Sequence, residues 1–192
     1  QVSIITLIQS SNNIGPDHST NNSHYSMRIL TIIGARPQFI KAAAVSRVIR
    51  LHNDIKEIIV NTGQHSDANM SDVFFEQLDI PRPDHQLDIA SLSHGAMTGR
   101  MLEGIEVLIK QEKPDWVLVY GDTNSTLAGA LAAAKVRVPI AHVEAGLRSQ
   151  NPDMPEEINR ILTDRISGLL LCPTKTAVEN LKREGFPNRI IG

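Results

Sequence analysis

The chain has 192 residues, of which 41% are hydrophobic and only 4% aromatic, enough to bury one sizeable core and to favour a single domain. Its 19 basic and 21 acidic residues nearly balance, which argues against nucleic acid or an anionic membrane as a general partner. The single cysteine, Cys172, excludes an internal disulfide and indicates a reducing compartment, the cytoplasm.

The chain opens with sequence that does not read as part of a folded domain. Residues 9–26 are rich in Ser and Asn and have no periodic apolar pattern, so we expect residues 1–26 to form a disordered extension. A buried-strand pattern follows Met27 at once, and we hypothesise that translation starts at this methionine. No apolar run approaches the ~20 residues that cross a bilayer, and the opening residues lack the basic segment and cleavage site of a signal peptide.

From Met27 onward, short apolar runs alternate with segments of helical period. The runs predict strands at 28–33, 57–61, 116–120, 138–142 and 169–172, with a short extended piece at 86–89. The helical segments are 37–52, 67–78, 93–114, 123–135, 155–167 and 174–184. Continuously apolar strands that alternate with helices predict a parallel sheet with helices on both faces, a doubly wound α/β domain over residues 27–192.

Ligands of such sheets bind at the carboxyl ends of the strands, so the segments that follow the strands are the informative ones. These are GARPQFIK (34–41), NTGQH (61–65), GDTNST (121–126), EAGLRS (144–149) and CPT (172–174). Four of them carry polar or charged groups out of proportion to the rest of the chain.

The first segment places two basic residues around the start of a helix. Arg36 and Lys41 flank free helical N–H groups, which favour an anion such as a phosphate or a carboxylate. The alternative is that Arg36 pairs with a nearby acid and Lys41 lies in solvent. The segment is neither a dinucleotide fingerprint nor a P-loop, because G-x-G-x-x-G and G-x-x-x-x-G-K-[ST] are both absent.

Two carboxylates directly follow strands. Asp122 could cap the next helix, accept a hydrogen bond from a sugar hydroxyl or take a proton. Glu144 ends a buried strand, where its charge must be paired or hydrated, so a functional role is favoured over a salt bridge with Arg148. The histidines near the same rim, His65 and His142, are interpreted as packed or hydrogen-bonded residues.

The segment PEEINR adds two more acids at the start of a helix. Pro155 suits the first turn, and Glu156 and Glu157 suit the positive end of the helix dipole. Glu157 is interpreted as serving only that purpose. Glu156 could pair with Arg160 at i+4 or turn toward the strand ends.

In this order, GARPQFIK, NTGQH, VYGDTNSTLAGALAA, HVEAGLRS and PEEINR resemble the non-hydrolysing UDP-N-acetylglucosamine 2-epimerases over nearly everything from Met27 to the C-terminus. The resemblance implies a glycosyltransferase-B-like architecture, with the active site between two Rossmann-like halves. It implies the interconversion of UDP-N-acetylglucosamine and UDP-N-acetylmannosamine by elimination and re-addition of UDP, with neither a metal nor another cofactor.

Site residues carry over from the same motifs. The resemblance makes Asp122, Glu144 and Glu156 the acid/base and charge-stabilising carboxylates. It implies that the residues binding substrate or a regulatory UDP-sugar are Arg36, Lys41, Gln64, His65 and Arg148. Asp67 stands where some bacterial members carry a glutamine of the regulatory site, so this sequence departs from them there.

In this family a second domain supplies most uridine and diphosphate contacts and a catalytic histidine, and the sequence ends about where the first domain does. We therefore expect negligible epimerase activity from this chain alone, with a separately encoded C-terminal epimerase domain as a partner. The exposed cleft face leads us to expect self-association, of which a homodimer is one form. The alternatives are a glycosyltransferase-B-like acceptor domain and a non-catalytic UDP-sugar-binding module.

Overall fold

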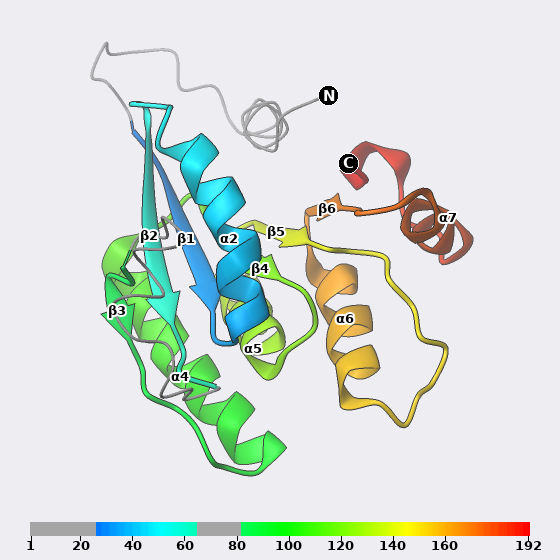
Figure 1. Ribbon diagram of the computed structural model, residues 1–192, viewed down its shortest axis with the longest axis horizontal. Coiled ribbons are helices and arrows are strands. Elements are labelled where there is room, and N and C mark those ends of the chain that lie inside the picture. Colours follow the sequence, from blue (N-terminus) through cyan, green and yellow to red (C-terminus); the bar gives the residue numbers. More distant parts are fainter. Residues whose placement is uncertain (1–25, 65–81) are drawn as a thin grey trace.

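The computed structural model describes residues 26–64 and 82–192. Within these ranges, parallel strands form one sheet in the order β3-β2-β1-β4-β5-β6 (Figure 1). The strands are β1 (Met27–Ile33), β2 (Ile55–Asn61), β3 (His85–Gln86), β4 (Trp116–Tyr120), β5 (Ile140–Val143) and β6 (Leu169–Leu171). The helices are α2 (Arg36–Ile49), α4 (His94–Glu112), α5 (Asn124–Lys135), α6 (Pro155–Ile166), α7 (Lys175–Arg183) and the short 3-10 helix η1 (Asn188–Ile190). This is a doubly wound α/β sheet, whose strand order reverses direction between β1 and β4.

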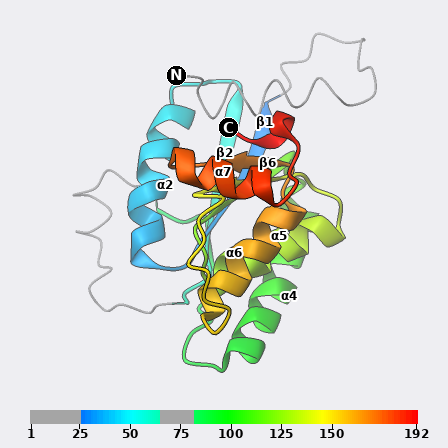
Figure 2. The same ribbon diagram turned by 90° about the vertical axis from the view of Figure 1, so that its right-hand side faces the viewer.

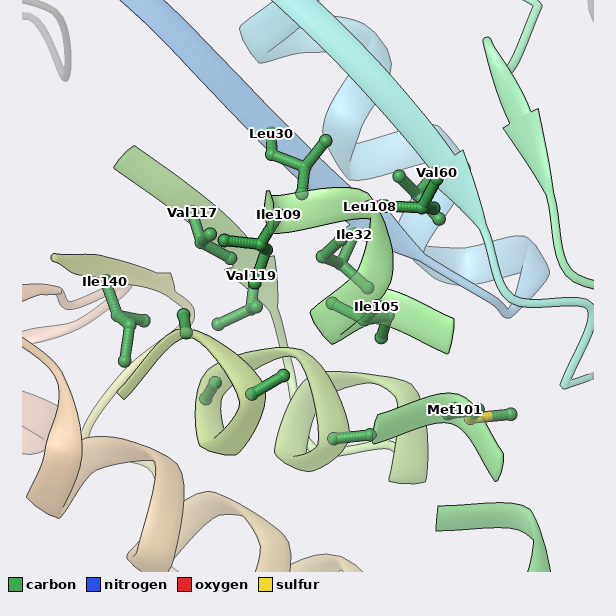
Figure 3. Packing of buried hydrophobic residues seen from close by; sticks show 14 of the residues in the cluster. Leu30, Ile32, Val60, Met101, Ile105, Leu108, Ile109, Val117, Val119 and Ile140 are labelled. Carbon is green, nitrogen blue, oxygen red and sulfur yellow. The ribbon is translucent and has the colours of Figure 1, made fainter. Parts of the chain in front are cut away.

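Both faces of the sheet are covered by helices. Helix α2 lies on one face, and α4 and α5 lie on the other (Figures 1 and 2). Alternate residues of β1 serve the two sides: Ile29 packs in the cluster with Phe39 of α2, and Leu30 and Ile32 pack in the cluster with Ile105 of α4 (Figure 3). Because helices shield both faces of the sheet from water, the strands are continuous apolar runs in the sequence.

The alanine-rich helix α5 lies unusually close to the sheet. A Cβ added at Gly129 would lie 3.1 Å from Cγ1 of Ile32, and the buried residues around it in α5 are also small. Such small side chains let the helix backbone approach the sheet closely. The start of α5 is thereby held next to the ends of β1 and β4, where the polar segments were predicted.

The predicted α/β class and the alternation of strands and helices are confirmed. The differences are local. The extended piece predicted at 86–89 is the two-residue edge strand β3, the strand predicted at 138–142 is Ile140–Val143, and the short helix η1 was not predicted. Residues 1–25 of the extension predicted at 1–26, the helix predicted at 67–78 and His65 lie outside the described residues. No helix in the described ranges is both long and apolar enough to cross a membrane.

A carboxylate under helix α2 gives a stability prediction. Glu57 of β2 accepts a 2.6 Å hydrogen bond from Thr31 Oγ1, and burial raises the pKa of Glu57 above its ordinary value. A raised pKa contributes stability below the unfolded-state pKa, and this contribution is lost as the pH rises through the folded-state pKa. Glu57→Gln keeps an acceptor for Thr31 and stays neutral, so we expect it to raise the free energy of unfolding at pH 7.

Urea unfolding from pH 4 to pH 8 measures this effect. The difference between Glu57→Gln and the parent chain should grow as the pH rises. The exposed Glu103 of α4 gives the matched control, and Glu103→Gln should stay within about 0.5 kcal/mol of the parent at every pH. A Glu57→Gln variant that matches the parent at pH 8 would contradict the prediction.

Candidate functional site

An ion pair joins α2, the helix that follows β1, to the residue that directly follows β5. Lys41, in the second turn of α2, donates from Nζ to Oε2 of Glu144, which directly follows β5. The Lys41 side chain is 41% exposed and the Glu144 side chain 25%, so solvent reaches both members. The exposed Arg36 begins the same helix. The start of α2 therefore places two basic side chains at the carboxyl edge of the sheet, where Lys41 contacts the Glu144 carboxylate.

The backbone at Glu144 has an unusual conformation. Its φ of 76° lies in the left-handed region, where the backbone strain of a non-glycine residue is of order 1–3 kcal/mol. Residues strained in this way cluster at functional sites. Gly121, which directly follows β4, also has a positive φ, of 66°, and a Cβ there would lie 3.2 Å from Oε2 of Glu144. The glycine thus leaves room for the carboxylate beside the turn that leads to Asp122.

Asp122 is held by α6. Its Oδ2 accepts a hydrogen bond from Nη2 of Arg160, and its backbone carbonyl accepts one of 2.9 Å from Nδ2 of Asn159. The Arg160 guanidinium also donates to Glu157 at 2.8 Å and is only 12% exposed. Arg160 was considered in the sequence only as a partner of Glu156. In the structure Arg160 pairs with Asp122 instead, so Arg160 joins the residues of the candidate site.

The two acids in the first turn of α6 differ sharply. Glu157 is buried and accepts hydrogen bonds of 2.9–3.1 Å from the backbone N–H groups of Ser149 and Gln150. Burial alone would raise the pKa of Glu157, but these hydrogen bonds and the charge of Arg160 outweigh it and hold the pKa below its ordinary value. Glu157 therefore anchors the loop that precedes the helix, as well as lying at the positive end of its dipole. Glu156 is exposed and has no hydrogen-bond or ion-pair partner in the part of the chain that the structure describes, which leaves its carboxylate available to a ligand.

Gln64 lies against the start of α5. Its Oε1 accepts hydrogen bonds from the backbone N–H of Ser125 at 2.9 Å and from the Ser125 hydroxyl at 2.7 Å. The loop after β2 is thereby fixed to the helix that follows Asp122. The neighbouring candidate, His65, lies outside the described residues.

Arg148 lies in a buried charge cluster. Its Nε and Nη2 donate to the two carboxylate oxygens of Glu184 at 2.7 and 2.8 Å, and its Nη1 donates to Asp164 at 2.7 Å. Its side chain is only 6% exposed, and these ion pairs outweigh burial and raise its pKa. The salt bridge with Glu144 that was considered for it does not form, because Glu144 pairs with Lys41. Binding of substrate by Arg148 stays a prediction.

The three candidate carboxylates differ in their surroundings. Asp122 and Glu144 each have a cationic partner, whereas Glu156 is open to solvent. Carboxylates placed in this way can take up or deliver protons and stabilise positive charge. Among residues 26–64 and 82–192, no group of three or more His, Cys, Asp or Glu side chains is placed to hold a metal ion.

The turn at Gly121 gives a second testable prediction. Gly121→Ala forces a side chain into the left-handed region and against Glu144, so we expect the free energy of unfolding to fall by about 1–2 kcal/mol. Gly99→Ala is the matched control, because nothing lies within 4 Å of a Cβ at this position in α4, and it should raise stability by about 0.5–1 kcal/mol. Urea unfolding of both variants measures the effects, and equal stability of the two would refute the strain at Gly121.

Comparison with known proteins points to one family. A family model described as UDP-N-acetylglucosamine 2-epimerase matches residues 47–192. The UDP-2,3-diacetamido-2,3-dideoxy-D-glucuronate 2-epimerase of Pseudomonas aeruginosa is 68% identical over 163 residues, which cover 85% of this chain and 46% of that protein.

Solved structures agree on the fold. The Methanocaldococcus jannaschii UDP-GlcNAc 2-epimerase, in complex with UDP-GlcNAc and UDP, superimposes with a TM-score of 0.83 at 49% identity, covering 86% of this chain and 46% of that one. A lipopolysaccharide outer core galactosyltransferase shares only the fold, with a TM-score of 0.60 at 15% identity over 86% of this chain and 44% of that one. The chain therefore belongs to the UDP-N-acetylglucosamine 2-epimerase family and spans about half the length of the relatives that it matches.

Proposed function

We propose that this chain supplies the N-terminal half of an epimerase that inverts C2 of a UDP-linked 2-acetamido sugar. The observation that carries the proposal is the pairing of Lys41 with Glu144 beside Gly121 and Asp122, within a chain that belongs to this family. Asp122, Glu144 and Glu156 are the proposed catalytic carboxylates. Arg36 and Lys41 are proposed to face the anionic nucleotide-sugar.

The reaction proposed for these carboxylates has two steps. In the first, a carboxylate removes the proton from C2 of the sugar while the bond from C1 to the UDP oxygen breaks, giving a 2-acetamidoglucal and UDP. In the second, UDP adds back to C1 and a protonated carboxyl group delivers a proton to the other face of C2. C2 has no adjacent carbonyl to acidify its proton, so the remaining carboxylate would stabilise positive charge that develops at C1.

The half of the enzyme outside this chain has a defined part in the proposal. It would supply most contacts to uridine and diphosphate, and with them the stabilisation of the departing UDP. We therefore propose that residues 1–192 alone turn over substrate negligibly. A cytoplasmic location, a C-terminal epimerase domain as partner and assembly as a homodimer belong to the same proposal.

Two substrates are candidates. UDP-N-acetylglucosamine is the substrate in the family description and in the name of the Methanocaldococcus jannaschii relative, which is 49% identical. UDP-2,3-diacetamido-2,3-dideoxy-D-glucuronate is named for the Pseudomonas aeruginosa relative, which is 68% identical. The higher identity to the Pseudomonas aeruginosa relative makes the diacetamido sugar the second candidate, and both sugars carry an acetamido group at C2.

One experiment tests the function and its alternatives. The chain is assayed alone and co-expressed with the C-terminal half of the Pseudomonas aeruginosa relative, and proton NMR follows C2 inversion of each sugar nucleotide. We expect turnover only in the two-part enzyme. Transfer of the sugar to an added acceptor by the two-part enzyme would support the glycosyltransferase-like acceptor domain. Binding of the sugar nucleotide by the two-part enzyme without turnover would support a UDP-sugar-binding module. Either result would overturn the epimerase proposal.

A further inference from the structure

A histidine and an aspartate that cannot reach solvent lie beneath the candidate carboxylates. His142 of β5 and Asp164 of α6 are both fully buried, and Nδ1 of His142 lies 2.7 Å from Oδ1 of Asp164. His142 precedes Glu144 by two residues on the same strand segment. Complete burial keeps both side chains from touching a substrate, so any effect on the reaction passes through other groups.

The partners of the ring determine where its hydrogens are. Nε2 of His142 lies 2.7 Å from the carbonyl oxygen of Gly121, which can only accept, so Nε2 carries a hydrogen. Nδ1 faces Oδ1 of Asp164, so the second ring nitrogen also has a fixed partner. The ring is therefore held at both nitrogens, by the turn at Gly121 and by Asp164 of α6.

The surroundings of Asp164 favour its ionised form. Burial raises the pKa of Asp164, but the hydrogen bond and charge of His142 and those of Arg148 outweigh it and lower the pKa below its ordinary value. The charged groups around the pair are Arg148 and, through it, Glu184. The Asp164 carboxylate is therefore bound by Arg148 as well as by His142.

The pair is bonded to both turns that carry candidate carboxylates. Gly121 is held on two sides, since its N–H donates to the carbonyl of Val143 at 2.9 Å and its carbonyl accepts from His142. The other oxygen of Asp164, Oδ2, accepts from the N–H of Gly146 at 3.1 Å. Gly121 directly precedes Asp122, and Gly146 follows Glu144 by two residues.

The second turn needs this support because its backbone is strained. Glu144 has a φ of 76°, and Gly146 has a φ of 78° in a place where a Cβ would lie 2.5 Å from the carbonyl oxygen of Ala177. A left-handed glutamate persists only where surrounding groups fix it. The hydrogen bond from Gly146 to Asp164 fixes the end of this turn from the buried side.

We propose that His142 and Asp164 are positioning residues, a buried hydrogen-bonded pair that fixes the positions of Asp122 and Glu144 relative to each other. The inference rests on the proposed function for its catalytic meaning. Its structural content, a buried pair whose hydrogen bonds fix both turns, is independent of any activity. Displacement of a catalytic group by about 1 Å can cost about 100-fold in rate, so loss of the pair should lower kcat much more than it changes KM.

NMR of the 192-residue chain tests the structural part. Imidazole nitrogen and proton shifts should show a hydrogen on Nε2 of His142, bonded to the carbonyl oxygen of Gly121. His142→Gln removes the ring that joins Gly121 to Asp164, and amide shifts and residual dipolar couplings at residues 121–123 and 144–146 should change in this variant. His85→Gln is the matched control, because His85 pairs with Glu112 at 3.0 Å and contacts neither turn. A His142 ring without a hydrogen on Nε2, or turns that are unchanged in folded His142→Gln, would overturn the proposal.

The two-part enzyme tests the catalytic part. We expect folded His142→Gln and Asp164→Asn to lose roughly 10- to 100-fold in kcat with little change in KM, while His85→Gln keeps the parent values. Parent kcat in either folded variant would refute positioning. An inactive parent enzyme would instead refute the proposed function, and the NMR result would then decide the inference by itself. If His142→Gln does not fold, the test uses kcat of Asp164→Asn and the NMR shifts of the His142 ring nitrogens in the parent chain.

Discussion

Replacing Arg148 with leucine should lower the free energy of unfolding by about 3–5 kcal/mol, because it leaves the buried carboxylate of Asp164 without its guanidinium partner. The loss should depend on pH with a definite sign. Asp164 has a lowered pKa, so its contribution to stability is present above the unfolded-state value of about 3.9 and is lost as the pH falls through the folded-state pKa. Urea unfolding should therefore show the largest difference between Arg148→Leu and the parent at neutral pH, and a smaller one toward pH 3.

The control for Arg148 is an arginine with a solvent-exposed side chain. Arg100 of α4 is exposed, and Arg100→Leu should change stability by no more than about 0.5 kcal/mol. Parent-like stability of Arg148→Leu, together with weaker binding of a UDP-sugar to the two-part enzyme, would contradict the prediction. It would return Arg148 to the substrate-binding role that the sequence motif suggested.

The fold was predictable because its causes are local in the sequence. A strand buried on both faces must be apolar at every position, and β4, with WVLVY, shows this pattern plainly. The edge strand β3 has only two residues, His85 and Gln86, and neither periodicity nor β propensity distinguishes them from a loop. The turn before η1 and the pairing of Ile191 with Leu170 likewise depend on tertiary contact and leave no local pattern.

The kinds of residue at the site were also predictable, but their partners were not. Parallel strands bring their carboxyl ends to one edge, so Glu144 and Lys41 could be expected near each other although they are 103 positions apart in the sequence. Helical spacing suggested Glu156 as the partner of Arg160, yet the guanidinium reaches Asp122 on the neighbouring loop. Helical spacing identifies possible partners only within one helix. It cannot identify an acid such as Asp122, which the fold brings close from another element.

His142 shows the same limit from the opposite direction. A lone histidine in a strand is most often a packed or hydrogen-bonded residue, and the structure bears this out: it is buried with Asp164 and Gly121. What the sequence could not give is that these two partners belong to the two turns of the candidate site. This link depends on β5 lying between β4 and β6, and on α6 placing Asp164 against His142 of β5.

The largest effect on activity is expected at Glu144. In the two-part enzyme, Glu144→Gln removes the charge and the proton-accepting ability of this side chain but keeps an oxygen for Lys41, so its geometry should persist. Loss of a positioned acid or base typically costs 10²- to 10⁴-fold, and we expect a fall of this size in kcat with KM nearly unchanged. Proton NMR measures C2 inversion directly, and in deuterated water it also reports exchange of the C2 proton, which should fall in parallel.

A surface pair of the same composition is the control for Glu144→Gln. Glu106 and Lys110 form an ion pair on α4, so Glu106→Gln makes the identical chemical change away from the carboxyl edge of the sheet and should leave kcat unaltered. If Glu144→Gln kept the parent rate of inversion and of C2 proton exchange, this carboxylate could not handle the proton. The base would then have to be sought at Asp122 or Glu156, where Asp122→Asn and Glu156→Gln test the remaining two positions in the same assay. Loss of proton exchange in only one of these variants would identify that carboxylate as the one that handles the C2 proton, because deuterium enters C2 only after the original proton has been removed and UDP has added back.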